Sequence, residues 1–208
     1  MADQSDHSEG WNDVVSEYKQ ARSAVGARMV ATWAVDALPD GAEVIDVGCG
    51  TGIPIAAALA AEGLTVFGVD ASPRMVEEFE RNLPGMPVRC EAAQDGDYFD
   101  RRFDGAVCIG LLFLLEPDDQ FTSLRRLAAA IRPGGRLLLS VPAEPCEWHD
   151  AQTGRKSQSL GHAAYLEHLR SLDMRLTALM IDEGGNDYID AVKNADSTVD
   201  PDIDGWEK

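Results

Sequence analysis

The stretch Val44-Ile45-Asp46-Val47-Gly48-Cys49-Gly50-Thr51-Gly52 joins a mostly apolar run to a turn with a glycine at every second position. The apolar run is typical of a short strand that is buried on both faces of a parallel sheet. Glycine adopts positive φ angles without steric cost, so this turn can bend sharply and lie close to a ligand. Residues 54–62 are rich in Ala and Leu and stop at Gly63, which predicts a helix. The order strand, glycine turn, helix predicts a nucleoside-binding turn, with a purely structural turn as the alternative.

A second buried run follows this helix and ends in an acid. Residues 64–70 predict a strand, and Asp70 comes 24 positions after Asp46. An aspartate at this place can accept hydrogen bonds from both hydroxyls of a ribose, although such a residue also serves as a helix cap. Ser72-Pro73 has the pattern of an N-cap followed by proline in the first helical turn, which predicts the next helix.

The rest of the chain continues the alternation of strand and helix. The predicted strands cover residues 88–92, 103–112 and 136–141, and the predicted helix between the last two covers residues 118–131. Helical spacing of apolar residues predicts one or two further helices within residues 11–38. Such alternation predicts a doubly wound α/β fold, with a parallel sheet covered by helices on both faces.

The strand and helix alternation stops in the last third of the chain, where two predicted strands follow each other directly. A helix over residues 163–172 precedes two strands, 174–181 and 188–192, and a Gly-rich turn at residues 182–186 joins these strands. Two strands joined in this way form an antiparallel hairpin. We therefore expect a single domain over residues 11–193, with a disordered start at 1–10 and an acidic tail at 194–208.

Composition limits the class of protein and its partners. The 208 residues include 36 acidic and 18 basic ones, and the formal net charge of -18 disfavours binding to a nucleic acid. The start of the chain lacks the basic and apolar regions of a secretory signal, and its apolar runs are too short for a membrane helix. The four cysteines lack the paired C-x-x-C spacing of a zinc or redox site, which is typical of reduced thiols. These features predict a cytoplasmic protein, either a monomer or a homodimer.

The glycine turn resembles motif I of the class I S-adenosylmethionine-dependent methyltransferases. The resemblance continues through Asp70-Ala71-Ser72-Pro73-Arg74-Met75, Phe103-Asp104-Gly105-Ala106-Val107 and Ile131-Arg132-Pro133-Gly134-Gly135, and it covers about residues 40–142. It implies a Rossmann-like sheet of five parallel strands closed by the hairpin, in the order 3-2-1-4-5-7-6. A weaker resemblance links the C-terminal part to small bacterial methyltransferases of unassigned acceptor.

The resemblance also implies a cofactor, S-adenosylmethionine, and the residues that bind it. Asp46 and the backbone of the turn are implied at the methionine moiety, Asp70 at the ribose, and Ile109 near the sulfonium. The full set of implied cofactor-binding residues is Asp46, Gly48, Cys49, Gly50, Gly52, Asp70, Ala71, Ser72, Met75, Glu91, Ala92, Ile109 and Gly110.

Two other functions fit the glycine turn. A nicotinamide-dependent oxidoreductase has the pattern G-x-G-x-x-G, but Ile53 occupies the position of its third glycine, which disfavours this alternative. A protein that binds S-adenosylmethionine without catalysing transfer is the other alternative, and the sequence does not exclude it.

The acceptor is expected to bind in a loop after the fifth strand, residues 142–160. His149 is the predicted catalytic base, because an unperturbed imidazole titrates near neutral pH, and a solvated histidine is the alternative. Tyr18, Trp148 and Tyr165 are predicted to wall the acceptor site, and each is equally compatible with core packing. With no separate recognition domain and no Asn/Asp-Pro-Pro-aromatic signature after the fourth strand, a small molecule is the expected acceptor.

The acidic C-terminal stretch also carries a partial calcium-loop pattern. Asp200, Asp202, Asp204 and Gly205 match only the first half of that loop. An acidic tail is the favoured interpretation, and no metal site is predicted.

Overall fold

The centre of the molecule is a seven-stranded sheet in the order β3-β2-β1-β4-β5-β9-β8, in which β9 runs antiparallel to both of its neighbours. This computed structural model describes residues 7, 8 and 10–195. The sheet strands are β1 (Glu43–Val47), β2 (Thr65–Asp70), β3 (Val88–Cys90), β4 (Phe103–Ile109), β5 (Ile131–Ser140), β8 (Met174–Ile181) and β9 (Asp187–Lys193). The predicted fold class is confirmed, since β8 and β9 are the sixth and seventh strands of the order 3-2-1-4-5-7-6.

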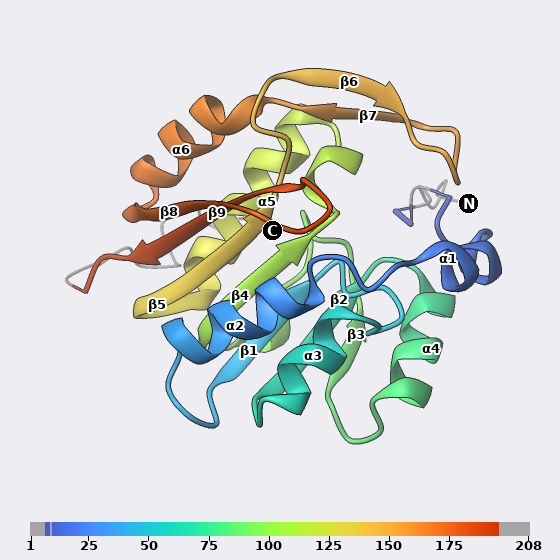
Figure 1. Cartoon of the computed structure of the whole chain (residues 1–208), viewed down its shortest axis with the longest axis horizontal. Coiled ribbons are helices and arrows are strands. Elements are labelled where there is room, and N and C mark those ends of the chain that lie inside the picture. The colour runs from blue at the N-terminus through green and yellow to red at the C-terminus, as the bar shows by residue number, and fades with distance from the viewer. Residues whose placement is uncertain (1–6, 9, 196–208) are drawn as a thin grey trace, which may run out of the picture.

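Helices cover both faces of the sheet (Figure 1). The helices of the described residues are α1 (Val15–Ala21), α2 (Ala27–Ala37), α3 (Ile55–Ala61), α4 (Pro73–Asn82), α5 (Pro117–Ala130) and α6 (Gly161–Ser171), with short 3-10 turns η1 (Tyr98–Asp100) and η2 (Leu112–Leu114). Within β1, Val44 packs with α2, α3 and α4, while Ile45 packs with α5 and α6. Successive side chains of a strand point to opposite faces, so one short strand contributes to two cores.

Local signals explain where the helix after β2 begins. The hydroxyl of Ser72 accepts a hydrogen bond from the Met75 amide at 3.2 Å, and Pro73 stands in the first turn. The cap satisfies an amide that the first helical turn leaves without a partner. Met75 and Phe79 are buried on the inner face of the helix, as its apolar spacing predicts.

Several boundaries differ from the sequence-based expectation. The third strand ends at Cys90 rather than at residue 92, and the fourth ends at Ile109 rather than at residue 112. The fifth strand begins at Ile131, earlier than expected, with a register shift in its pairing to β4.

The stretch expected to be an acceptor loop contains a second, two-stranded sheet. Strands β6 (Cys146–His149) and β7 (Lys156–Ser159) pair as an antiparallel hairpin. Lys-Ser-Gln-Ser contains no apolar residue, and the alternation in Cys-Glu-Trp-His covers only four residues, so no strand is predicted from these sequences. This hairpin arches over one end of the main sheet (Figure 1).

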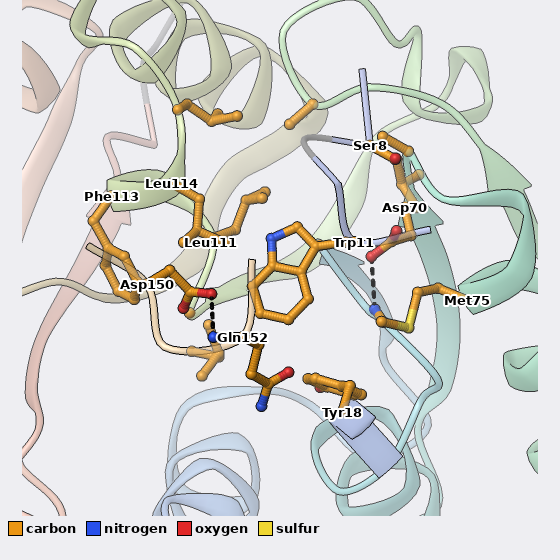
Figure 2. Close-up of a pocket in the computed structure, with 18 of the residues that line it drawn as sticks. Ser8, Trp11, Tyr18, Asp70, Met75, Leu111, Phe113, Leu114, Asp150 and Gln152 are labelled. Carbon is orange, nitrogen blue, oxygen red and sulfur yellow. Dashed lines mark hydrogen bonds between the residues drawn. The ribbon is translucent and has the colours of Figure 1, made fainter. Parts of the chain in front are cut away.

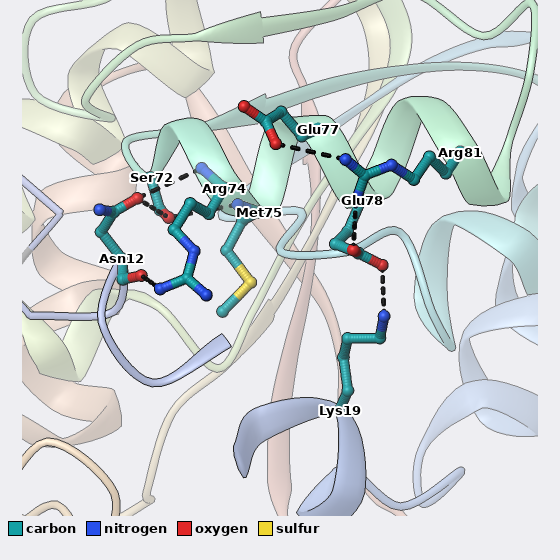
Figure 3. Close-up of polar contacts among 8 residues, drawn as sticks. All are labelled: Asn12, Lys19, Ser72, Arg74, Met75, Glu77, Glu78 and Arg81. Carbon is teal, nitrogen blue, oxygen red and sulfur yellow. Dashed lines mark hydrogen bonds and ion pairs between the residues drawn. The ribbon is translucent and has the colours of Figure 1, made fainter. Parts of the chain in front are cut away.

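The N-terminal part of the chain is attached to α4 (Figure 3). The Asn12 side-chain oxygen accepts hydrogen bonds from the Ser72 hydroxyl at 3.1 Å and from the Arg74 amide at 3.2 Å. The Arg74 guanidinium donates to the Asn12 carbonyl at 2.8 Å, and Lys19 forms an ion pair with Glu78 at 2.5 Å. These contacts hold residues 11–21 against the start of α4, beside the glycine turn.

In residues 7, 8 and 10–195, no helix has both the length and the apolar composition needed to cross a bilayer. The acidic tail from residue 196 onward, with the partial calcium-loop pattern, lies outside the described residues, as do residues 1–6 and 9.

Candidate functional site

Two cavities adjoin each other at the carboxyl edge of the parallel strands. The first, of about 330 Å³, lies against the glycine turn and is called the turn cavity here. The second, of about 600 Å³, lies between the end of β5 and the turn that joins β8 to β9, and is called the hairpin cavity. Residues that line both cavities are Arg22, Ser23, Ile109, Gly110 and Phe113. Ligands in the two cavities would therefore meet at the end of β4.

The glycine turn is held in place by the neighbouring strand. The amides of Gly48 and Cys49 donate to the Val69 carbonyl at 2.8 and 3.0 Å. Gly48 and Gly50 have positive φ angles of 78° and 53°. A Cβ on Gly48 would lie 2.8 Å from the Leu111 side chain, and a Cβ on Gly50 would lie 3.1 Å from the Tyr18 hydroxyl. These positions therefore require glycine for conformation and for space.

Asp70 connects the glycine turn to the start of α4. One carboxylate oxygen accepts from the Gly50 amide and the other from the Ser72 amide, both at 2.9 Å. Burial raises the pKa of this carboxyl, and the two backbone hydrogen bonds oppose that rise. Each oxygen keeps a further lone pair, and Asp70 lines the turn cavity (Figure 2).

Asp46 is a buried acid directly before the turn, with only 2% of its surface exposed. Burial, and then the negative charge of Asp70, raise its pKa to about 7, while the Arg22 charge opposes this rise. Its Oδ2 atom is buried and accepts no hydrogen bond within the described chain. A cation placed nearby would stabilise the ionised form of Asp46.

Other polar atoms at the cavities also lack a partner within the described residues. They are the Nε of Arg22, the Oε2 of Glu91 and the Oε1 of Gln152, all of which are buried. Glu91 and Gln152 line the turn cavity, and Arg22 lines both cavities. Buried polar atoms in folded proteins are usually hydrogen-bonded, so a polar ligand here would supply missing contacts.

The structure brings most of the sequence-predicted cofactor residues together. Those that line the turn cavity are Gly48, Gly50, Asp70, Ala71, Met75, Glu91, Ile109 and Gly110. Those that lie behind its wall are Asp46, Cys49, Gly52, Ser72 and Ala92, all of them buried or tightly enclosed. Ser72 caps α4 and Gly52 packs against Phe79, so these two support the wall.

The predicted acceptor residues separate into different places. Trp148 lines the hairpin cavity, with its ring 5.2 Å from that of Phe113. Tyr18 lies against Gly50 in the turn cavity instead. Tyr165 is fully buried in the core, where its hydroxyl donates to Gln120 and accepts from the Leu160 amide, so the prediction that it walls the acceptor site is not supported.

His149 does not reach either cavity. It follows Trp148 in β6, where it is exposed and opposite Lys156 of β7. Neighbouring side chains of a strand point in opposite directions, so a hairpin that turns Trp148 inward turns His149 outward. The structure thus gives no support to the predicted catalytic base.

Sequence reasoning missed several residues of the two cavities. They are His7, Ser8 and Trp11 near the N-terminus, Arg22 after α1, Gln152 in the β6–β7 turn, and Asn186 and Asp187 at the start of β9. Ser8 lies within the segment 1–10 that the sequence predicts to be disordered, and this residue is 5% exposed. Nothing in the sequence around Arg22 singles it out, because the helix before it, Val15–Ala21, is mostly polar.

A family model described as "Methyltransferase domain" matches residues 18–179 of the chain. Among curated proteins, the O-methyltransferase cnsE of Penicillium expansum is 32% identical over 146 residues, which cover 65% of this chain and 51% of that protein. The cypemycin N-terminal methyltransferase of Streptomyces sp is 35% identical over 133 residues, covering 61% and 52%. The chain thus spans about half the length of these curated relatives.

A solved structure shows the same fold over nearly the whole chain. It is the Burkholderia thailandensis 1,6-didemethyltoxoflavin-N1-methyltransferase with bound 1,6-didemethyltoxoflavin and S-adenosylhomocysteine. The TM-score is 0.72 at 22% identity, with 93% of this chain and 92% of that chain covered. At this identity the likeness concerns the fold.

Proposed function

Since this chain belongs to the class I S-adenosylmethionine-dependent methyltransferases, we propose that it transfers the methyl group of that cofactor to a small-molecule acceptor. The observation that carries the proposal is a cavity with buried acids beside a glycine turn, opening at the end of β4 into a second cavity. The cofactor would occupy the turn cavity and the acceptor the hairpin cavity. The family assignment disfavours the alternative of a nicotinamide-dependent oxidoreductase.

The residues present at the turn cavity fit the chemistry of S-adenosylmethionine. Asp70 would accept hydrogen bonds from the ribose hydroxyls, and the unpartnered Oε2 of Glu91 would accept one from the adenine amino group. The cofactor carries a sulfonium and an ammonium, and the nearby charge of Asp46 would favour both. Arg22, whose Nε lacks a partner within the described chain, is suited to the cofactor carboxylate.

The chain's contribution to the reaction is mainly one of placement. The bound cofactor supplies an activated methyl group, so holding the acceptor atom close to it and in line with the breaking bond accounts for much of the acceleration. Ile109 and Gly110 lie at the junction of the two cavities, where the methyl group would pass. Phe113 and Trp148 would hold a flat acceptor at that junction.

Calorimetric titration with S-adenosylmethionine, S-adenosylhomocysteine and NADH tests the cofactor assignment. We expect the first two to bind with one site per chain. The variant Asp70→Asn should bind about 10- to 100-fold more weakly, because it loses a charged hydrogen-bond acceptor. Asp36→Asn, an exposed aspartate on α2, is the matched control and should bind normally. Binding of NADH alone would overturn the assignment.

Transfer itself is tested with methyl-labelled S-adenosylmethionine and fractionated small-molecule extract. Label in a small molecule supports the proposed reaction. Tight binding of S-adenosylhomocysteine with no labelled product in any fraction would instead favour the alternative of a non-catalytic cofactor-binding protein.

A further inference from the structure

Asp187 lies at the edge of the sheet where the glycine turn lies, although it comes late in the sequence. It is the first residue of β9, which runs antiparallel to β5, so the start of β9 lies beside the end of β5. The Asp187 carbonyl accepts from the Val141 amide at 3.1 Å, directly after β5. This placement makes Asp187 part of the hairpin cavity wall.

One oxygen of the Asp187 carboxylate is fixed and the other is available. The Oδ2 atom accepts a hydrogen bond from the Ala143 amide at 3.0 Å, which holds the side chain in one orientation. Within residues 7, 8 and 10–195, no group donates to the Oδ1 atom and no cationic side chain forms an ion pair with Asp187. A ligand in the hairpin cavity would find an oriented carboxylate with an unused acceptor oxygen.

The other ionisable groups on this cavity are not suited to accept a proton. Arg22 stays protonated in proteins and has no acceptor atom. The Tyr188 hydroxyl donates to Asp182 at 2.9 Å, and burial together with that aspartate raises the pKa of Tyr188. His149 points away on β6, as described above. Among the described residues that line the hairpin cavity, Asp187 is therefore the one whose side chain is suited to accept a proton.

We propose that Asp187 is the catalytic base of methyl transfer and that the acceptor is a planar aromatic molecule that presents an O–H or N–H group. This inference rests on the proposed function. The lone pair of the acceptor oxygen or nitrogen forms the new bond to the methyl carbon, and the carbon–sulfur bond breaks with its electron pair left on sulfur. The acceptor proton moves to Asp187 and from there to water. The flat walls made by Phe113 and Trp148 favour an aromatic ring next to the carboxylate.

The test uses methyl-labelled S-adenosylmethionine with two series of probes, ring-substituted phenols and ring-substituted benzimidazoles. The variant Asp187→Asn keeps an oxygen for the Ala143 amide but cannot accept a proton. We expect the single-turnover rate to fall about 10²- to 10⁴-fold with unchanged affinity for S-adenosylhomocysteine. Glu144→Gln and His149→Gln, which alter exposed residues nearby, are matched controls and should leave the rate unchanged. Whichever series is methylated identifies the acceptor atom as oxygen or nitrogen.

Variation of the probe distinguishes a base from a structural residue. The loss caused by Asp187→Asn should shrink as the acceptor group becomes more acidic, because an acidic acceptor depends less on a base. A loss that is the same for all probes, or no loss, would overturn the proposal. So would the absence of methylation in both series if extract fractions are methylated. Absence of cofactor binding, or of any labelled product, would instead be a failure of the proposed function.

Discussion

Asp46 is a buried acid whose ionised form is unfavourable for stability, and under the proposed function that same form would favour binding of the cofactor. Its carboxyl is buried, has an oxygen without a partner in the described chain, and has a pKa of about 7. In the folded protein this group therefore binds a proton more tightly than in the unfolded chain. Its contribution to stability is fully present below pH 4 and is lost as the pH rises through about 7.

The variant Asp46→Asn should therefore be more stable than the parent above pH 7. Its advantage in the free energy of unfolding should grow by about 1.4 kcal/mol per pH unit between pH 4 and 7 and then level off. Urea unfolding without ligand at pH 4.5, 6 and 8 measures this. An equal advantage at all three pH values would contradict the role of ionisation.

Cofactor affinity should change in the opposite direction. The ionised form of Asp46 attracts the cationic cofactor, so the affinity of the parent protein for S-adenosylmethionine should rise as the pH increases through about 7. In Asp46→Asn this dependence should vanish and the affinity should stay low. Calorimetry across the same pH range measures both, with the neutral-sulfur product S-adenosylhomocysteine as comparison ligand.

Two glycines with the same backbone conformation differ in their surroundings. Gly52 and Gly63 have φ angles of 79° and 82°. A Cβ on Gly52 would lie 2.8 Å from Phe79, whereas a Cβ on Gly63 would meet nothing within 4 Å. Gly63→Ala should cost about 1–2 kcal/mol from backbone strain. Gly52→Ala should cost about 1–3 kcal/mol more from overpacking, and equal losses in thermal unfolding would contradict this distinction.

At these single positions the sequence predicted the lining of the turn cavity better than the lining of the hairpin cavity. Gly48 and Asp70 belong to a motif whose spacing along the chain fixes their spacing in the fold. Tyr165 and Trp148 are both aromatic residues near the same predicted loop. Tyr165 is buried in the core with its hydroxyl bonded to Gln120, whereas Trp148 lies beside Phe113 on the hairpin cavity, and their sequence positions do not reveal this difference. Asp187 gives no local signal, because its role arises from antiparallel pairing to a distant strand.

Among the elements, the N-terminal segment forms a cover over the turn cavity. Trp11 and Tyr18 line that cavity, with their rings edge to face at 5.8 Å. The cover is held by the contacts of Asn12 and Lys19 with α4 (Figure 3). A ligand in the turn cavity would be enclosed between this cover and the glycine turn.

Removing one attachment of the cover should speed ligand release. Arg74→Ala removes the 2.8 Å hydrogen bond to the Asn12 carbonyl. Loss of one such bond costs about 1 kcal/mol, so S-adenosylhomocysteine should dissociate about fivefold faster in stopped-flow measurements. Glu80→Ala is the control on the same helix, since Glu80 is exposed and forms no hydrogen bond or ion pair in the described chain. The same release rate in both variants would argue against the cover.

The elements also show where sequence patterns are informative. The central strands β1, β2 and β4 are largely buried and apolar, and the sequence predicted where each of them lies, with errors at their ends. Strands β6 and β7 are mostly polar and lie outside the main sheet, where β7 contacts η2 and Trp148 of β6 lies next to Phe113. The apolar alternation of β6 is only four residues long and β7 has no apolar residue, so hydrophobic periodicity gives little signal for this hairpin.

Over the whole molecule, negative charge exceeds positive charge by 18. Like charges that are brought together on folding repel each other, and dissolved salt screens that repulsion over about 10 Å at 0.1 M. Raising sodium chloride from about 20 to about 200 mM should therefore raise the melting temperature by a few degrees. Calorimetry with sucrose as a non-ionic control measures this, and a lower melting temperature in salt would contradict the expectation.

The strand order has a consequence for how the molecule is assembled during synthesis. β8 comes before β9 in the chain, yet β9 lies between β8 and β5, so β8 joins the sheet only after β9 has been made. The glycine turn and Asp70 are finished long before that step. Growing chains can therefore acquire the wall of the turn cavity first and the wall that contains Asp187 last. A chain whose synthesis stopped before β9 would contain the glycine turn and Asp70 but would lack Asp187 and Tyr188 of the hairpin cavity, so completion of β9 brings the two cavities together.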